Sequence, residues 1–115
     1  MLTPVVPVVA DLIALAEEGL PRRENSAKKI VVIGAGMAGL VAAQALIRAG
    51  HEVLLLEAQA RVGGRVQTLR EPFTDGLYAE AGAMRIPRSH ALTLSYLRRF
   101  GVGTAPFTAS NPNAY

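Results

Sequence analysis

The sequence contains no cysteine and only two histidines, and these shortages exclude several kinds of chemistry. Without cysteine there is no disulfide framework, no thiol nucleophile and no Cys-type zinc site. His51 and His90 stand far apart, and neither has an acidic or histidine partner at the spacing of metal ligands. The sequence therefore predicts no metal site.

Tryptophan is absent as well, and the sequence has no cluster of basic residues. The chain has 12 Lys and Arg against nine Asp and Glu, so its formal net charge is only +3. The basic residues are scattered, and three Tyr and three Phe are too few for a base-stacking surface. Nucleic acid is not an expected partner.

A long uninterrupted hydrophobic run is missing too. The apolar stretch from Leu2 to Leu15 is broken by Pro4, Pro7 and Asp11, and no basic residue precedes it. A signal peptide needs a positive beginning and a continuous apolar stretch, and a membrane span needs about 20 apolar residues. We therefore expect no signal peptide, no membrane span and a cytoplasmic location.

Half of the 115 residues are hydrophobic, which is enough to bury a core of about one small domain. Residues 11–18 have the pattern of a short helix, with Asp11 as its cap and a Schellman-type stop at Gly19–Leu20. Pro21 to Lys29 is a polar, charged linker. The organisation expected is an N-terminal helix and linker over 1–27, followed by the main domain over 28–115.

The main domain begins with a strand, a helix and a second strand. Ile30–Ile33 is a continuous β-branched run, typical of a strand buried on both faces of a parallel sheet. A helix through Ala49 follows, with Gly50 as its end, and Val53–Leu56 forms the second buried strand. This pattern predicts an α/β fold with a parallel βαβ unit. Two strands make too small a sheet for a domain, so we expect the unit to be incomplete.

Weaker signals occupy the rest of the chain. Turn residues cluster in one segment, and two short extended segments flank it. A final amphipathic helix is expected, with Ser89 as its cap and Gly101 as its stop. The expected segments are an extended 65–70, a turn over 71–76, a strand over 77–81 and a helix over 90–100.

Gly34-x-Gly36-x-x-Gly39 is the glycine fingerprint of a dinucleotide site. Gly34 allows the tight turn after the strand, Gly36 lets the backbone approach a pyrophosphate, and Gly39 lets the helix pack closely on the sheet. The amides at the start of the helix then face the phosphates. Glu57 ends the second strand, where it can accept hydrogen bonds from a ribose. The context predicts a Rossmann-like unit that binds FAD or NAD.

The loop after Glu57 favours FAD. Two adjacent glycines, Gly63 and Gly64, allow this loop to approach the same diphosphate, and Arg65 follows them with a guanidinium. Residues 34–65 resemble the flavin-containing amine oxidase superfamily, whose signature is the fingerprint, the acidic strand end and an R-x-G-G-R loop. The resemblance implies an incomplete FAD-binding domain with a short helix at each end.

A narrower resemblance follows at Gly82-x-Met84-Arg85-x-Pro87. It resembles the G-x-M-R-x-P segment of L-amino-acid oxidases and bacterial tryptophan 2-monooxygenases, where the loop lies beside the flavin and its Arg binds the substrate carboxylate. A planar guanidinium is a natural bidentate partner for a carboxylate. The alternative from sequence alone is an internal ion pair, for example between Arg85 and Glu80.

The resemblance, which covers about residue 11 onward, implies an FAD-dependent oxidation of L-amino acids. By analogy the substrate passes a hydride from its Cα to the flavin, the imino acid is hydrolysed to a keto acid and ammonia, and dioxygen becomes hydrogen peroxide. Arg85 is the only residue to which it gives a catalytic role, in holding the substrate carboxylate. The implied FAD contacts are Gly34, Gly36, Met37, Ala38, Gly39, Glu57, Ala58, Arg65, Gly82, Ala83, Met84 and Arg85.

Full members of this family are several times longer, and their FAD domain is discontinuous. We therefore expect residues 28–115 to be the N-terminal part of such a domain, completed by a companion chain or by a missing C-terminal part. We expect the 115 residues alone to be inactive and poorly stable. The alternatives are a tryptophan 2-monooxygenase, a monoamine or polyamine oxidase, and a non-catalytic FAD-binding module.

Overall fold

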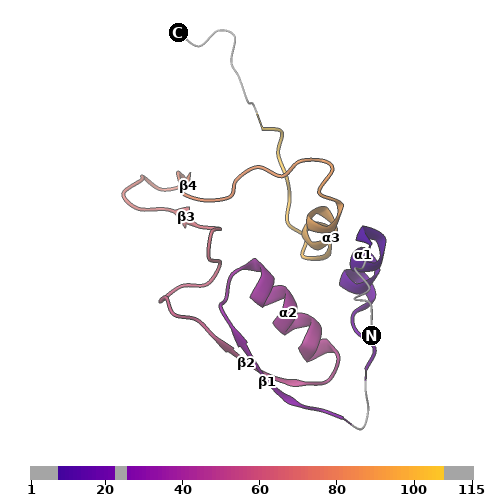
Figure 1. Ribbon diagram of the computed structural model, residues 1–115. Helices are drawn as coiled ribbons and strands as arrows, with labels where there is room; N and C mark the ends of the chain where they lie inside the picture. Colours follow the sequence, from indigo (N-terminus) through magenta and orange to yellow (C-terminus); the bar gives the residue numbers. More distant parts are fainter. Residues whose placement is uncertain (1–7, 23–25, 108–115) are drawn as a thin grey trace.

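A computed structural model describes residues 8–22 and 26–107 of the chain. It confirms a mixed α/β fold with a parallel β1-α2-β2 unit, an N-terminal helix and a C-terminal helix, and the two helices lie side by side (Figure 1). The elements are α1 (Val9–Glu18), β1 (Lys29–Ile33), α2 (Met37–Arg48), β2 (Glu52–Leu56), β3 (Thr68–Leu69), β4 (Ala79–Glu80) and α3 (Ala91–Arg99).

The β1-α2-β2 unit forms where the sequence predicts it. β1 and β2 pair in parallel, with Ile30 opposite Val53 and Ile33 opposite Leu56. Their β-branched and leucine side chains suit a pleated, buried surface. Gly50 then ends α2 in the left-handed region, at φ +92°, and the next amide, of His51, bonds back to the carbonyl of Leu46 at 3.1 Å. This is the Schellman pattern that ends many helices.

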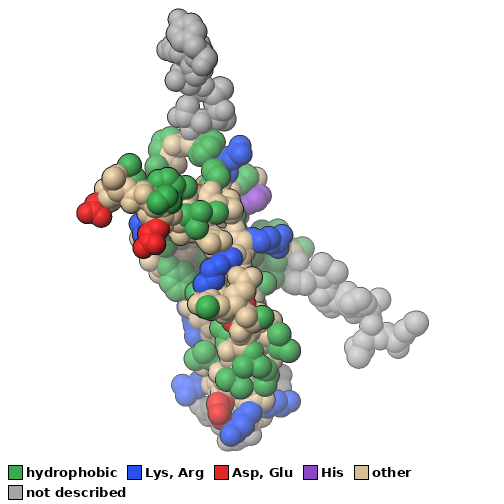
Figure 2. Space-filling model, turned by 90° about the vertical axis from the view of Figure 1, so that its left-hand side faces the viewer, with side chains coloured by type: hydrophobic (Ala, Val, Ile, Leu, Met, Phe, Trp, Pro, Cys, Tyr) green, Lys and Arg blue, Asp and Glu red, His purple; other side chains and the backbone are tan. Residues whose placement is uncertain are grey.

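The expectation that both faces of this sheet are buried is wrong for the described residues. α2 packs on one face, which carries Val32 and Leu55, while burial alternates along both strands. Ile33 on the other face is 86% exposed and Leu54 57%. No second layer of the described chain covers that face. The view towards this side shows hydrophobic side chains at the surface of the lower part of the molecule (Figure 2).

The first helix begins earlier than its polar cap suggests. Val9 is the first helical residue of α1 and Val8 is its N-cap, so Asp11 is not the cap as predicted. Asp11 instead stands in the first turn, where its carboxylate accepts a hydrogen bond from the Val8 amide at 3.1 Å. Gly19 ends the helix as predicted, but at φ +91° and ψ 177° it does not have the Schellman conformation.

The N-cap of the last helix lies one residue after the predicted cap. His90 is the N-cap of α3, and Ser89, the predicted cap, lies just outside it. At the other end Gly101 stops the helix as predicted, at φ +64°, and the following amide of Val102 bonds to the carbonyl of Leu97 at 2.9 Å. This is a second Schellman stop, formed because glycine adopts positive φ without a steric cost.

The two weak extended segments form a short antiparallel pair. β3 and β4 are shorter than the predicted segments, and Thr68 lies opposite Glu80 in their register. The turn predicted between them contains no helix or strand. The Thr68 hydroxyl donates to Glu80 Oε1 at 2.8 Å, so the side chains reinforce the backbone pairing.

α1 packs against α3 (Figure 1), and two arginines bind the C-terminal end of α1. Arg48 at the end of α2 donates to the carbonyls of Glu17 and Glu18 at 3.2 and 2.9 Å, and Arg99 of α3 donates to that of Ala16. The last carbonyls of a helix have no partner within the helix, and a positive group there also complements the helix dipole. These contacts join α1 to the following elements. The division at residue 27 stays a prediction.

No helix within residues 8–22 and 26–107 is long and apolar enough to cross a membrane. The apolar stretch considered above for a signal peptide begins outside the described residues. The cytoplasmic location stays a prediction.

The two faces of β2 should respond differently to truncation. In residues 1–115, Leu55→Ala should lower the free energy of unfolding by about 2 kcal/mol, because it removes contacts with α2. Leu54→Ala on the opposite face should cost less than about 0.5 kcal/mol. Urea unfolding followed by circular dichroism measures both, and an equal loss would mean that the second face is also covered.

Candidate functional site

The turn between β1 and α2 brings the fingerprint glycines together. Gly34 leaves the strand at φ +96°, and its amide donates to the Leu56 carbonyl of the neighbouring strand at 2.7 Å. A Cβ at Gly39 would overlap the carbonyl oxygen of Gly34, so only glycine allows the helix to start this close to the turn. No side chain caps the amides of the first turn of α2 and no acidic residue stands there. This end of α2 can receive an anion.

Glu57 follows β2, and its carboxylate holds this turn by accepting backbone hydrogen bonds. Its Oε2 accepts a hydrogen bond from the Ala35 amide at 2.7 Å, and its Oε1 accepts one from the Gln59 amide at 2.9 Å. The hydrogen bonds from Gln59 and Ala35 lower the pKa of the Glu57 carboxyl. Each carboxylate oxygen has a second lone pair, so the predicted contact with a ribose is chemically compatible with both bonds.

The loop after β2 returns to the fingerprint through its glycine pair. The Gly63 amide donates to the Ala35 carbonyl at 2.8 Å, and Gly36 and Gly63 form an isolated parallel bridge. A Cβ built on Gly64 would come within 3.2 Å of the Gly36 Cα, tighter than ordinary contact. The two turns thus form a narrow cradle of backbone, and side chains at these positions would fill it. Such a cradle fits the diphosphate of a dinucleotide.

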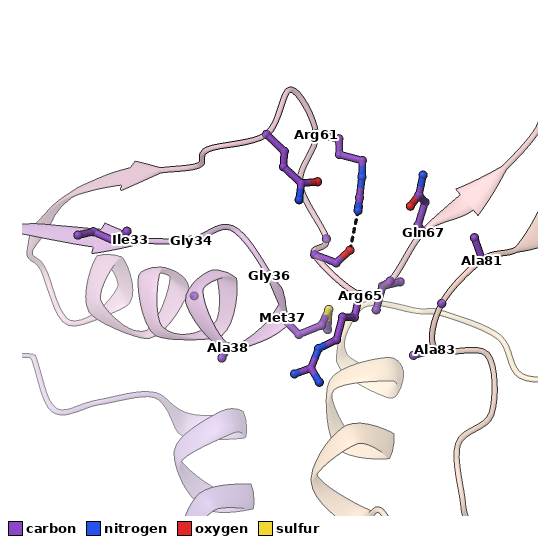
Figure 3. Close-up of a pocket in the computed structure, with 16 residues that line it drawn as sticks. Ile33, Gly34, Gly36, Met37, Ala38, Arg61, Arg65, Gln67, Ala81 and Ala83 are labelled. Carbon is purple, nitrogen blue, oxygen red and sulfur yellow. Dashed lines mark hydrogen bonds between the residues drawn. The ribbon is translucent and has the colours of Figure 1, made fainter.

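A cleft of about 1150 Å³ opens around this cradle (Figure 3). Eight of the predicted cofactor residues line it, and Arg65 adds a guanidinium beside the start of α2. Those eight are Gly34, Gly36, Met37, Ala38, Gly39, Arg65, Gly82 and Ala83. Glu57 reaches the same turn through its bond to Ala35, and Ala58 follows it as an exposed residue outside the cleft wall.

Part of the cleft wall was not among the predicted site residues. Gly63 and Gly64 stand in the predicted loop motif, so their place in the wall could have been read from it. Arg61 is the first arginine of the same R-x-G-G-R loop, so it could have been read from that motif as well. No motif marks the remaining lining residues. The additional lining residues are Ile33, Gln59, Arg61, Gly63, Gly64, Val66, Gln67 and Ala81.

The segment after β4 is held against the loop that carries Arg65. The Ala83 amide donates to the Arg65 carbonyl at 3.0 Å, and the Ala81 amide to the Gln67 carbonyl at 2.9 Å. Between them Gly82 lies so close that a Cβ would overlap the Arg65 carbonyl oxygen. Gly82 therefore permits a contact that no other residue could make without a backbone shift.

Met84 and Arg85 continue from this segment into a second cavity of about 950 Å³. The Arg85 guanidinium lies over the Phe107 ring, 5.0 Å from its centroid. Arg85 forms no ion pair within the described ranges, and Glu80 instead accepts the hydrogen bond of the Thr68 hydroxyl. The pairing of Arg85 with Glu80, the sequence alternative, is not formed. Arg85 is an exposed residue.

A family model described as flavin containing amine oxidoreductase matches residues 37–115. YobN of Bacillus subtilis (strain 168) is 49% identical over 102 residues, which cover 89% of this chain and 21% of YobN. The L-amino-acid oxidase of Pseudechis australis is 48% identical over 105 residues, 91% of this chain and 20% of that enzyme. The chain therefore spans about a fifth of the length of these relatives.

A solved structure has a region that resembles this chain in fold. A triple mutant of putrescine oxidase, made in a redesign of cofactor binding, matches with a TM-score of 0.56 and 35% sequence identity. The match covers 66% of this chain and 17% of the other. The putrescine oxidase therefore has a region with the same arrangement of elements.

The lowered pKa of Glu57 predicts a pH dependence. A carboxyl whose pKa is lower in the folded state stabilises the fold above its unfolded pKa, and this contribution disappears as the pH falls through the folded value. Glu57→Gln should therefore lower stability at pH 7 and make it fall less steeply on acidification. Urea midpoints of both proteins from pH 7 to pH 3 test this, and parallel curves would contradict it.

Gly82→Ala tests the close contact between the two loops. The added methyl group should force the Arg65 carbonyl away and cost about 1–3 kcal/mol of unfolding free energy. Gly103→Ala is the matched control, because a Cβ there meets nothing within 4 Å. Thermal or urea unfolding of both variants measures the difference, and equal stabilities would show that Gly82 has room for a side chain.

Proposed function

Since the chain belongs to the flavin containing amine oxidoreductase family, we propose that it is the FAD-binding N-terminal portion of an L-amino-acid oxidase. Two kinds of evidence support this finer assignment. The Pseudechis australis relative is named an L-amino-acid oxidase. The cradle and the uncapped start of α2 suit a diphosphate.

One observation carries the choice of an amino-acid substrate. Gly82 and Ala83 line the cleft of the cradle, and the next two residues, Met84 and Arg85, line the second cavity. Arg85, which forms no ion pair with the part of the chain that the structure describes, therefore follows closely in sequence on the lining of the dinucleotide cleft. A guanidinium in this place can pair with the carboxylate of a substrate, whereas a simple amine has no carboxylate to pair with it.

The residues proposed to hold FAD act on its diphosphate and ribose. The amides of Met37 and Ala38 at the start of α2 face the diphosphate, and Arg65 neutralises its charge. Glu57 accepts the ribose hydroxyls on its free lone pairs. Bound FAD supplies the electron acceptor for oxidation of the substrate. The proposed contacts of Ala58, Met84 and Arg85 with the cofactor rest on the family resemblance.

Arg85 is proposed to hold the carboxylate of the L-amino acid and so to orient its Cα for oxidation. The overall reaction converts the amino acid, dioxygen and water to a keto acid, ammonia and hydrogen peroxide. The remaining elements of the site are proposed to come from a companion chain or from further sequence of the same protein, because the chain spans a fifth of its relatives. Residues 1–115 alone are then inactive.

Arg85→Ala tests this assignment in the active protein with its accompanying part. The loss of a charge-assisted bidentate contact should raise KM for L-amino acids by about 100-fold, and leave turnover of a primary amine without a carboxylate unchanged. Arg88→Ala is the matched control, because Arg88 lines the same cavity three residues further on. Its KM should stay within about threefold of the unsubstituted protein.

Product analysis separates the remaining candidates. Keto acid, ammonia and peroxide in equal amounts support the oxidase, whereas an amide and carbon dioxide from L-tryptophan would identify a tryptophan 2-monooxygenase. An unchanged KM in Arg85→Ala would favour a monoamine or polyamine oxidase. Flavin that binds but is not reduced by any amino acid or amine would indicate a non-catalytic module.

A further inference from the structure

Arg61 lies in the loop between Glu57 and the glycine pair, and its side chain lines the dinucleotide cleft. Its Nη2 donates to the carbonyl oxygen of Gly64 at 2.8 Å (Figure 3). Gly64 has φ +59°, which glycine adopts without steric cost, and the bond from Arg61 fixes the orientation of its carbonyl. This bond uses one of the two terminal nitrogens of the Arg61 guanidinium.

The turn that Arg61 holds sets the width of the cradle. The Gly63 amide donates to the Ala35 carbonyl at 2.8 Å, and Gly64 lies so close to Gly36 that a Cβ on it would be 3.2 Å from the Gly36 Cα. A movement of this turn would widen or close the space between the two glycine loops. The bond from Arg61 to Gly64 therefore acts on the geometry that a diphosphate would meet.

The other half of the guanidinium has no partner among the described residues. Arg61 Nη1 is buried and makes no hydrogen bond to any described residue. The Arg61 charge contributes to the lowered pKa of the Glu57 carboxyl, but within residues 8–22 and 26–107 no carboxylate forms an ion pair with Arg61. A buried cationic donor left unpaired is costly, and negative charge in the adjoining cleft reduces that cost.

We propose that Arg61 is a positioning residue of the dinucleotide site, which fixes the Gly63–Gly64 turn and favours a ligand that carries a diphosphate. This inference rests on the proposed function, because the anion is the diphosphate of FAD. One guanidinium arm holds the backbone of the cradle before the ligand arrives. Its positive charge is offset once the diphosphate is bound.

The test uses the protein purified with any accompanying chain and freed of flavin, so that folding of residues 1–115 alone is not assumed. The variants are Arg61→Met, which keeps the apolar stem, and Arg61→Lys, which keeps the charge. Arg98→Met is the control, because Arg98 is an exposed residue of α3 and its loss changes the net charge equally. Dissociation constants are measured for FAD, ADP and adenosine, together with amide exchange at Gly63.

Arg61→Met should weaken FAD and ADP by about tenfold or more and leave adenosine within about twofold, because adenosine has no diphosphate. Arg61→Lys should recover most of the ADP affinity. The Gly63 amide should exchange faster in Arg61→Met without any ligand, since its turn is no longer held. The control should match the unsubstituted protein in every measurement.

Unchanged ADP affinity in Arg61→Met would overturn the inference, and so would an equal loss for adenosine, which indicates general damage. If the unsubstituted protein binds neither FAD nor ADP, the proposed function fails and the preference for a diphosphate fails with it. In that case the exchange rate at Gly63 still tests whether Arg61 holds the turn.

Discussion

The site depends on the close approach of two glycine turns that follow neighbouring parallel strands, β1 and β2, at the same edge of the sheet. A Cβ on Gly64 would come within 3.2 Å of the Gly36 Cα, and the Gly63 amide bonds to the Ala35 carbonyl. This approach requires β1 and β2 to be paired in the observed register, because the two turns follow the ends of these strands. The pairing of the strands therefore places the cradle, and the glycines give it its shape.

The parts that the sequence predicts correctly are those controlled by local chemistry. The apolar runs around Val31 and Leu54 have the residue types that favour strands, and the fingerprint glycines suit a tight turn into a helix. Gly50 and Gly101 end their helices for the same local reason, since each adopts positive φ. Together these elements give the β1-α2-β2 unit and most of the cleft wall.

The parts that it misses depend on distant partners. Asp11 and Ser89 have the side chains of helix caps, yet α1 begins before Asp11 and α3 begins after His90. The exposed face of β1 and β2 was not predicted, because an apolar run does not reveal whether anything covers it. Nor does a loop arginine such as Arg61 show in advance which carbonyl it will hold.

Backbone contacts between two loops link the dinucleotide cleft to the second cavity. Arg65 contributes its side chain to the dinucleotide cleft, while its carbonyl receives the Ala83 amide and lies against Gly82. The segment that carries Arg85 is therefore aligned by the loop that carries Arg65. A shift of that loop would move the guanidinium in the second cavity, so the cofactor site and the proposed substrate contact are fixed by one set of backbone hydrogen bonds. In such an arrangement, orientation of a substrate relative to the cofactor follows from the packing of the loops themselves.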